Sequence, residues 1–165
     1  MAVPYLQVDN LTKSFGDLVL FENISFGIAE GQRVGLIAKN GSGKTTLMNM
    51  LSGIYFPDEG QIFINGKETV IRSPKDAYAC GIGMVHQHFM LARPMTVVEN
   101  VMLGKKSRRG ILLDTKETAT ELKELADKYK MNIDPYSKIW QLSVGEQQRV
   151  EILTAIYQGA DILIL

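Results

Sequence analysis

Alternation between apolar and polar side chains marks the first third of the chain. Residues 5–8 and 24–28 alternate apolar with small or polar side chains, which is typical of half-buried antiparallel strands. Residues 33–37 form a short apolar run instead, and this pattern predicts a fully buried strand of a parallel sheet. Residues 60–66 predict a further strand that ends in a turn, because the Asn-Gly pair at its end readily supplies positive φ angles.

Two segments of the second half carry the start signals of helices. Asp114 is followed three residues later by Glu117, as in a capping box, and apolar residues then recur at helical spacing to about residue 130. Ser143 and Glu146 repeat the signal ahead of a helix that we expect to reach about residue 158. The second half is therefore predicted to be mainly helical.

The order of these patterns predicts an α/β fold. Residues 46–51 are helical in composition and follow the buried strand closely, and residues 161–165 repeat the buried-strand pattern. We expect a mainly parallel core sheet with an antiparallel β flank and a helical insertion. The β-rich core should occupy residues 1–86, and the helical subdomain should occupy residues 87–158.

Composition and charge narrow the class of partner. The chain has 165 residues, of which 45% are hydrophobic and 22% charged, so one domain with a real core is expected. Its 18 basic residues balance 18 acidic ones, so no global charge favours nucleic acid or an anionic membrane surface. The basic run at residues 105–109 is most simply a solvated loop.

Cysteine content and the search for targeting signals both bear on where the chain is expected to work. The single cysteine, Cys80, excludes an intramolecular disulfide and fits a reducing cytosol. Residues 1–10 lack the basic start and apolar stretch of a signal peptide. No apolar run approaches the roughly 18 residues that a membrane helix needs. Any role at a membrane is therefore expected to come through a partner.

The strongest chemical signal lies between the apolar run at residues 33–37 and the helical segment. It reads Ala38-Lys39-Asn40-Gly41-Ser42-Gly43-Lys44-Thr45, and Thr46 follows. Backbone N–H groups turned inward by its glycines would form a concave anion site at the positive end of the next helix. Lys44 would bring its charge to the β and γ phosphates, the Thr45 hydroxyl would ligate Mg²⁺, and Thr46 could donate to a phosphate oxygen. The segment predicts binding of the phosphates of a nucleoside triphosphate together with Mg²⁺.

The segment departs from the pattern G-x-x-x-x-G-K-S/T at its first position, where Ala38 replaces glycine. A methyl group is tolerable there at negative φ and costs about 1 kcal/mol at positive φ. The alternative is an ordinary glycine-rich turn, but the strand and helix predicted on either side favour phosphate binding. Because several enzyme classes share such a loop, it identifies a ligand rather than a function.

Four further segments accompany the phosphate loop. They are Phe15 before Gly16, the turn at residues 57–62 followed by Gly66, Gln87 after a short strand, and residues 142–150. Taken singly, Phe15 could be a core residue, Gln87 a surface amide and Ser143 a simple helix cap. In this order and spacing, the segments together resemble the ATP-binding cassette (ABC) ATPases, whose LSGGQ signature appears here as Leu-Ser-Val-Gly-Glu-Gln.

The resemblance covers essentially the whole chain and implies roles by position. In the family an aromatic residue at the position of Phe15 stacks on adenine. The glutamine at the position of Gln87 reaches Mg²⁺ and the attacking water. Signature residues matching Ser143 and Gly145 face the γ-phosphate held by the opposite subunit, so ATP would join two cassettes.

The implied fold is a P-loop NTPase core with a helical subdomain, truncated at the Walker B strand that residues 161–165 begin. In the family an Asp that organises Mg²⁺ and a catalytic Glu follow that strand. We therefore expect this polypeptide alone to bind nucleotide weakly, to lack turnover and to be marginally folded. The parent protein is expected to be a competent ATPase.

Residues 81–91, residues 96–101 and the Val-Gly-Glu-Gln form of the signature are similar to the ATPases of bacterial simple-sugar and nucleoside importers, with a lean toward nucleosides. That likeness implies a second cassette domain, transmembrane permease subunits and, indirectly, an extracytoplasmic substrate-binding protein as partners, without nucleic acid. It also implies a peripheral place on the cytoplasmic face of the membrane. His86 and His88 have no evident third and fourth ligands, so a metal site there is not expected.

Two other functions stay open. A non-transport cassette protein that acts on ribosomes or DNA would be expected to carry basic arms, which the neutral net charge does not support. A non-hydrolysing nucleotide sensor would differ from an enzyme in the two residues after Leu165, where Asp-Glu would favour the enzyme.

Overall fold

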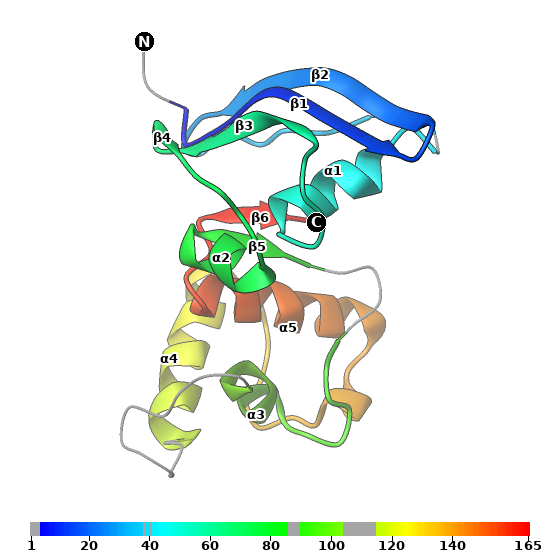
Figure 1. The fold of residues 1–165 in the computed structure, drawn as a ribbon. Helices are drawn as coiled ribbons and strands as arrows, with labels where there is room; N and C mark the ends of the chain where they lie inside the picture. The colour runs from blue at the N-terminus through cyan, green and yellow to red at the C-terminus, as the bar shows by residue number, and fades with distance from the viewer. Residues whose placement is uncertain (1–3, 38, 40, 86–89, 104–114) are drawn as a thin grey trace. The chain divides into compact units, whose positions relative to one another are not determined.

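The computed structural model describes residues 4–37, 39, 41–85, 90–103 and 115–165 (Figure 1). Strands and helices both occur, which confirms a mixed α/β chain. The chain divides into two compact units, Met1–Ile82 and Gly83–Leu165. The domain boundary expected between residues 86 and 87 remains a prediction.

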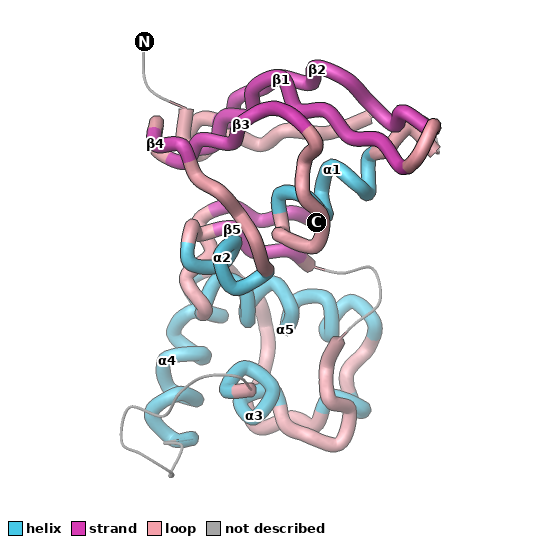
Figure 2. The backbone as a smooth tube through the Cα atoms, in the orientation of Figure 1, coloured by secondary structure: helices cyan, strands magenta, loops and turns pink. Residues whose placement is uncertain are grey.

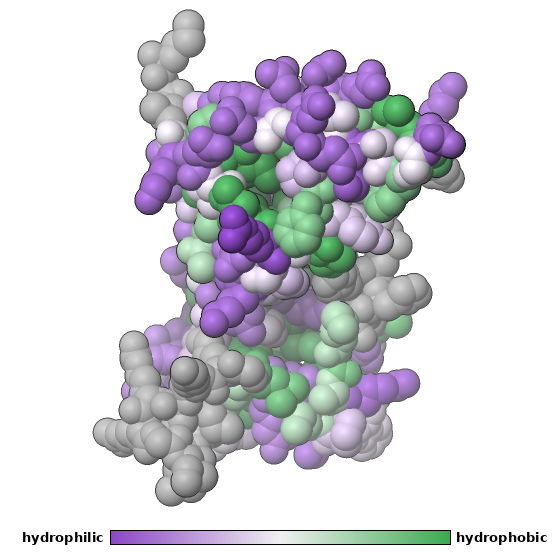
Figure 3. Space-filling view, in the orientation of Figure 1, coloured by the Kyte–Doolittle hydropathy of each residue, from purple (hydrophilic) through white to green (hydrophobic). Residues whose placement is uncertain are grey.

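A four-stranded antiparallel sheet dominates the first unit (Figure 2). Its strands, in the spatial order β2-β1-β3-β4, are β1 (Leu6–Phe15), β2 (Leu18–Ile28), β3 (Glu59–Ile64) and β4 (Lys67–Glu68). Leu6, Val8 and Leu11 of β1 are buried, and a register shift between Val8 and Leu11 interrupts the alternation. In Figure 3, hydrophilic side chains gather over the strands of this sheet. The antiparallel flank predicted from the alternation is therefore confirmed, with longer strands than the pattern indicated.

Two helices and a tight turn complete the first unit. They are α1 (Lys44–Leu51) and α2 (Pro74–Ala79). Helix α1 buries Leu47, Met50 and Leu51, and its chain leaves the helix at Gly53, where φ is 76°. At the predicted Asn-Gly turn between β3 and β4, Asn65 and Gly66 have φ angles of 51° and 74°. Both sequence signals are confirmed.

The apolar run at residues 33–37 is not a buried strand, and that prediction is wrong. Val34, Leu36 and Ile37 are 53%, 45% and 96% exposed, and no strand covers the run. A central strand is buried only when neighbouring strands satisfy its backbone groups on both edges. Among the described residues the sheets are β2-β1-β3-β4 and β5-β6, and neither contains this run. Apolar composition alone could not supply the neighbours.

The second unit consists of helices and a short two-stranded sheet. Its elements are β5 (Ile82–Met84, which begins at the last residue of the first unit), α3 (Val97–Met102), α4 (Thr115–Lys128), the 3₁₀ helix η1 (Ile139–Gln141), α5 (Val144–Tyr157) and β6 (Ile162–Ile164). Strands β5 and β6 pair, and the Val85 N–H donates to the Ile164 carbonyl at 2.9 Å. The strand predicted at residues 161–165 is thus present, although Leu165 is 78% exposed.

Apolar faces of three helices form the core of the second unit. Val101 of α3, Leu122 of α4 and Leu153 of α5 are each at most 1% exposed and belong to one cluster. Helix α4 ends two residues before Lys130, whose φ of 55° is left-handed and cannot continue a helix. The predicted helix is confirmed, while Asp114 of its expected capping box lies outside the described residues.

Candidate nucleotide site

The phosphate loop turns sharply just before α1. Gly41 and Gly43 have φ angles of 84° and 80°, the left-handed region that favours glycine. Between them, Ser42 donates to the Lys39 carbonyl twice, from its N–H at 3.3 Å and from its hydroxyl at 2.7 Å. Ala38 and Asn40 lie outside the described residues. The described part of the loop therefore has the local turns that the glycines predicted.

The N-terminus of α1 carries no side-chain cap. Gly43 is the N-cap residue, no side chain hydrogen-bonds to the cap, and the first turn contains no acidic residue. Lys44 and Thr45 are exposed, and Thr46 is half-buried. The first N–H groups of a helix need acceptors from outside it and carry the positive end of the dipole. With the Lys44 ammonium added, this helix end is suited to an anion such as a phosphate group.

The loop rests on strand β2 at Gly43. A Cβ atom added to Gly43 would lie 2.7 Å from Phe21 Cδ1 and 3.3 Å from Leu20 Cβ. Phe21 is only 9% exposed, so its ring cannot move aside freely. At Gly41, its two chain neighbours aside, no atom of the described residues lies within 4 Å of the corresponding position. Sequence reasoning missed Phe21, because no local pattern links a strand residue to a distant glycine.

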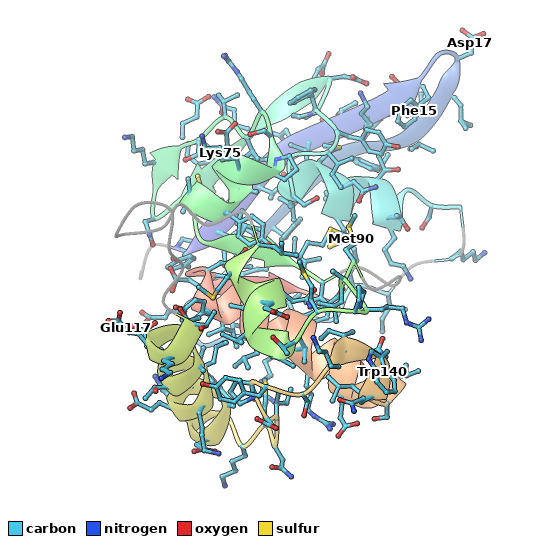
Figure 4. All side chains as sticks on the ribbon, turned by 90° about the horizontal axis from the view of Figure 1, so that it is seen from below. Phe15, Asp17, Lys75, Met90, Glu117 and Trp140 are labelled. Atoms are coloured by element: carbon cyan, nitrogen blue, oxygen red, sulfur yellow. The ribbon has the colours of Figure 1, made fainter. Side chains whose placement is uncertain are left out.

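Phe15 lies at the end of β1 and is 46% exposed (Figure 4). The alternative that it is a core residue is therefore excluded. The Lys13 ammonium lies 5.2 Å from the centre of its ring, and the Tyr55 ring lies 5.7 Å away at 76°. An exposed aromatic ring of this kind offers area on which a flat nucleobase can stack.

The signature segment begins helix α5 in the second unit. Ser143 is the N-cap residue and forms a complete capping box with Glu146. The Glu146 carboxylate accepts from the Ser143 N–H at 2.8 Å and from its hydroxyl at 2.6 Å. These hydrogen bonds, first from the hydroxyl and then from the N–H, lower the pKa of Glu146. The predicted cap is confirmed, and its own carboxylate occupies part of this helix end.

The apolar residue in the signature is open to solvent. Val144, which stands where the signature has its first glycine, is 71% exposed, and Gly145 is also exposed. A Cβ atom added to Gly145 would have only Arg149 Nη1 nearby, at 3.9 Å. Neither position is therefore constrained by packing among the described residues.

The remaining predicted site residue, Gln87, lies outside the described residues, as do His86 and His88. Just beyond them, the N–H of Met90 donates to Glu151 Oε1 at 2.8 Å. In the described part of the chain, no group of three or more His, Cys, Asp or Glu residues could hold a metal ion. None of the described helices combines the length and apolar character that crossing a membrane requires.

Comparison with known families gives one clear match. The family model described as ABC transporter matches residues 21–165. Among curated proteins, the Nucleoside import ATP-binding protein NupA of Lactococcus lactis subsp. cremoris is 46% identical over 96% of this chain. The Guanosine import ATP-binding protein NupO of Bacillus subtilis is 43% identical over the same share. The chain spans 31% of the length of each of these two relatives.

Solved structures agree in fold. A nucleotide-free ATP-binding cassette from an ABC transporter has a TM-score of 0.82 and 25% identity, covering 98% of this chain and 68% of that chain. The ADP conformation of an ATP-binding cassette of an ABC transporter has the same TM-score at 24% identity, and the match covers 67% of that chain. The chain therefore shares the fold of ATP-binding cassettes.

Proposed function

This chain belongs to the ABC transporter family, and on that premise we propose that the full-length protein binds and hydrolyses ATP with Mg²⁺ to drive solute import. The observation that carries the proposal is the uncapped N-terminus of α1, which follows two left-handed glycines and bears Lys44. Its N–H groups and its ammonium are all donors, as a triphosphate requires.

Each part of the loop has a separate task in this proposal. Residues 38–43 wrap the phosphates with backbone N–H groups, and Lys44 neutralises charge on the β and γ phosphates. The Thr45 hydroxyl would hold Mg²⁺, which would supply positive charge against the negative charge that spreads during transfer of the γ-phosphoryl group. Thr46 donates to a phosphate oxygen from the first turn of α1.

Three positions outside the loop complete the proposed site. Phe15 stacks on adenine, and its 46% exposure supports that role. Gln87 would help to hold Mg²⁺ and to position the attacking water. Ser143 and Gly145 contact the γ-phosphate held by a second cassette domain, so two cassettes close around the nucleotide.

The proposed cargo is a nucleoside or a simple sugar. Support comes from the relatives' names, which include nucleoside and guanosine import in addition to glucose and arabinose import. Transmembrane permease subunits would form the path, and an extracytoplasmic substrate-binding protein would deliver the cargo to them. The cassette would bind the permease at the cytoplasmic face of the membrane. Uptake of labelled guanosine, ribose and glucose by cells with and without the intact gene would separate the two cargo classes.

The ATPase proposal is tested with Lys44→Ala in the full-length protein, and Lys75→Ala serves as the matched control. Lys75 is an exposed lysine of α2 in the same unit, away from the proposed loop in sequence. Loss of Lys44 should lower phosphate release by about 100-fold or more, since it removes a charged donor from the developing transition state. The control should match the unmodified protein. Equal activity of both variants, or no MgATP binding by the unmodified protein, would overturn the proposal.

A further inference from the structure

We propose that Asp58 is a positioning residue that holds the Phe15 ring in place as the stacking surface for the nucleobase. The inference rests on the proposed ATP-binding function. It adds to the proposed nucleotide site a residue that lies outside the phosphate loop. It starts from the position of Asp58 immediately before β3, from where its carboxylate reaches the last residues of β1.

The Asp58 carboxylate uses both oxygens on two neighbouring residues. Oδ1 accepts from the Lys13 ammonium at 2.6 Å, and Oδ2 accepts from the Ser14 N–H at 2.7 Å and the Ser14 hydroxyl at 3.0 Å. The Asp58 N–H in turn donates to the Thr12 carbonyl at 3.0 Å. Four hydrogen bonds thus hold three consecutive residues of β1 immediately before Phe15.

This attachment replaces regular strand pairing where the ladder is interrupted. The register between β1 and β3 shifts between Asp9 and Thr12, and Thr12 is the last paired residue of β1 on that side. Beyond it, β3 provides no further backbone partner for the end of β1. The side chain of Asp58 therefore does for Ser14 what a neighbouring strand would otherwise do.

The same contacts reach the aromatic ring through Lys13. Its ammonium is held by Asp58 and lies 5.2 Å from the centre of the Phe15 ring, within the range of a cation–π contact. Tyr55 contacts the ring from a second direction, and its N–H donates to the Asn49 carbonyl of α1 at 3.2 Å. The ring is held by two neighbours yet stays 46% exposed, so a base can stack on the part left open.

The charge state of Asp58 suits a permanent attachment. Hydrogen bonds from Lys13 and then from Ser14 lower its pKa to about 2. The carboxylate is therefore ionised across the pH range in which such a protein works. A simpler role would be to stabilise the β1–β3 ladder alone, which would affect every ligand of the protein equally. If Asp58 positions Phe15, its substitution should weaken only ligands that carry a base. If it only stabilises the ladder, all ligands should weaken equally.

The test compares Asp58→Asn with Glu59→Gln in the full-length protein. Glu59 is the next residue, is exposed, and has no side-chain partner within the described ranges, so its substitution removes the same charge without these contacts. Two probes are titrated, both with Mg²⁺. One is 1,N6-ethenoadenosine triphosphate, whose base fluoresces and is quenched by stacking, and the other is inorganic triphosphate, which has no base. Phe15→Ala sets the size of the whole base contribution.

Asp58→Asn should weaken the etheno nucleotide about threefold to tenfold, the range of one aromatic contact, and reduce its quenching. Inorganic triphosphate should change by less than about twofold, and Glu59→Gln should alter neither probe. Equal weakening of both probes by Asp58→Asn, or results equal to those of Glu59→Gln, would overturn the inference while leaving ATP binding intact. No binding of either probe by the unmodified protein would instead overturn the proposed function.

If Asp58→Asn does not fold, Lys13→Gln tests the same link from the other side, because it leaves the contacts of Asp58 with Ser14 in place. It should give a smaller loss in the same base-selective direction. A Lys13→Gln protein that binds and quenches the etheno nucleotide like the unmodified protein would overturn the inference. So would a Phe15→Ala protein that shows no base-selective loss.

Discussion

Helices α1 and α5 both begin at predicted motifs, but their N-termini are built in opposite ways. Helix α1 starts after Gly43, without a side-chain cap and without an acidic residue in its first turn. Helix α5 starts after Ser143, with Glu146 closing a capping box from within the chain. The same element of structure can thus present free donors to a ligand or satisfy them itself, and one or two side chains decide between these outcomes.

The difference bears on what each helix end can bind. At α1 an incoming phosphate meets N–H groups and an ammonium, and no carboxylate of the first turn opposes it. At α5 the Glu146 carboxylate already accepts from Ser143, so a phosphate that approaches the Ser143 hydroxyl must displace or accommodate that charge. The box does not use the N–H groups of Val144 and Gly145. These two groups are the donors through which α5 is best able to contact a phosphate.

The largest effect on stability is expected at the glycines before α1. Gly43→Ala should destabilise the protein by about 2–4 kcal/mol, because the methyl group adds overpacking against Phe21 to the cost of a left-handed alanine. Gly41→Ala has the left-handed cost alone, about 1 kcal/mol. Urea unfolding of the full-length variants measures both, and MgATP titration then shows whether the loop still binds.

A double substitution isolates the contact between Gly43 and Phe21. Phe21→Ala creates the space that the new methyl group needs, so Gly43→Ala should cost less in that background than alone. Additive costs in the double variant would show that the ring is not what restricts Gly43. Equal destabilisation by Gly41→Ala and Gly43→Ala would contradict the packing argument in the same way.

Removal of the cap at the N-terminus of α5 should lower the stability of the protein by a smaller amount. Ser143→Ala removes the acceptor for the Glu146 N–H and one donor to its carboxylate, and should cost about 1 kcal/mol. Thr96→Ala is the matched variant, because Thr96 and Glu99 form the same box at α3. Guanidinium unfolding midpoints should fall by similar amounts for both. A Ser143→Ala protein as stable as the unmodified one would show that the cap of α5 does not contribute.

The smallest expected effect is a dependence of stability on pH. It should arise at the N-terminus of α5, where Glu146 closes the capping box, and not at that of α1. Because hydrogen bonds from Ser143 lower the pKa of Glu146 in the folded protein, its carboxylate stabilises the fold above the unfolded pKa of about 4.3. That contribution is lost as pH falls through the lowered value. Glu146→Gln should therefore flatten the fall in urea midpoint between about pH 5 and pH 3. An unchanged slope would contradict the assignment, with Glu59→Gln as the control substitution at an exposed carboxylate outside any capping box.

Signals that act over a few residues were predictable from the sequence. The capping box at Ser143, the start of α1 after the glycines and the turn at Asn65 and Gly66 are all confirmed. Each depends on backbone angles or hydrogen bonds between residues close in sequence, so the local pattern contains the needed information. The run at residues 33–37 failed for the opposite reason, because burial of a strand depends on partners that its own residues do not specify.

The sequence by itself determined the tight turn before α1 and the ammonium beside it, since the left-handed glycines and Lys44 define both locally. Only the tertiary structure decided which residues support that loop and the exposed ring. Phe21 lies beneath Gly43, and Asp58 holds Lys13 across a separation of 45 residues. Such contacts form because the strands β1, β2 and β3 pair side by side, and pairing between strands brings together residues whose relation no periodic pattern along the chain can express.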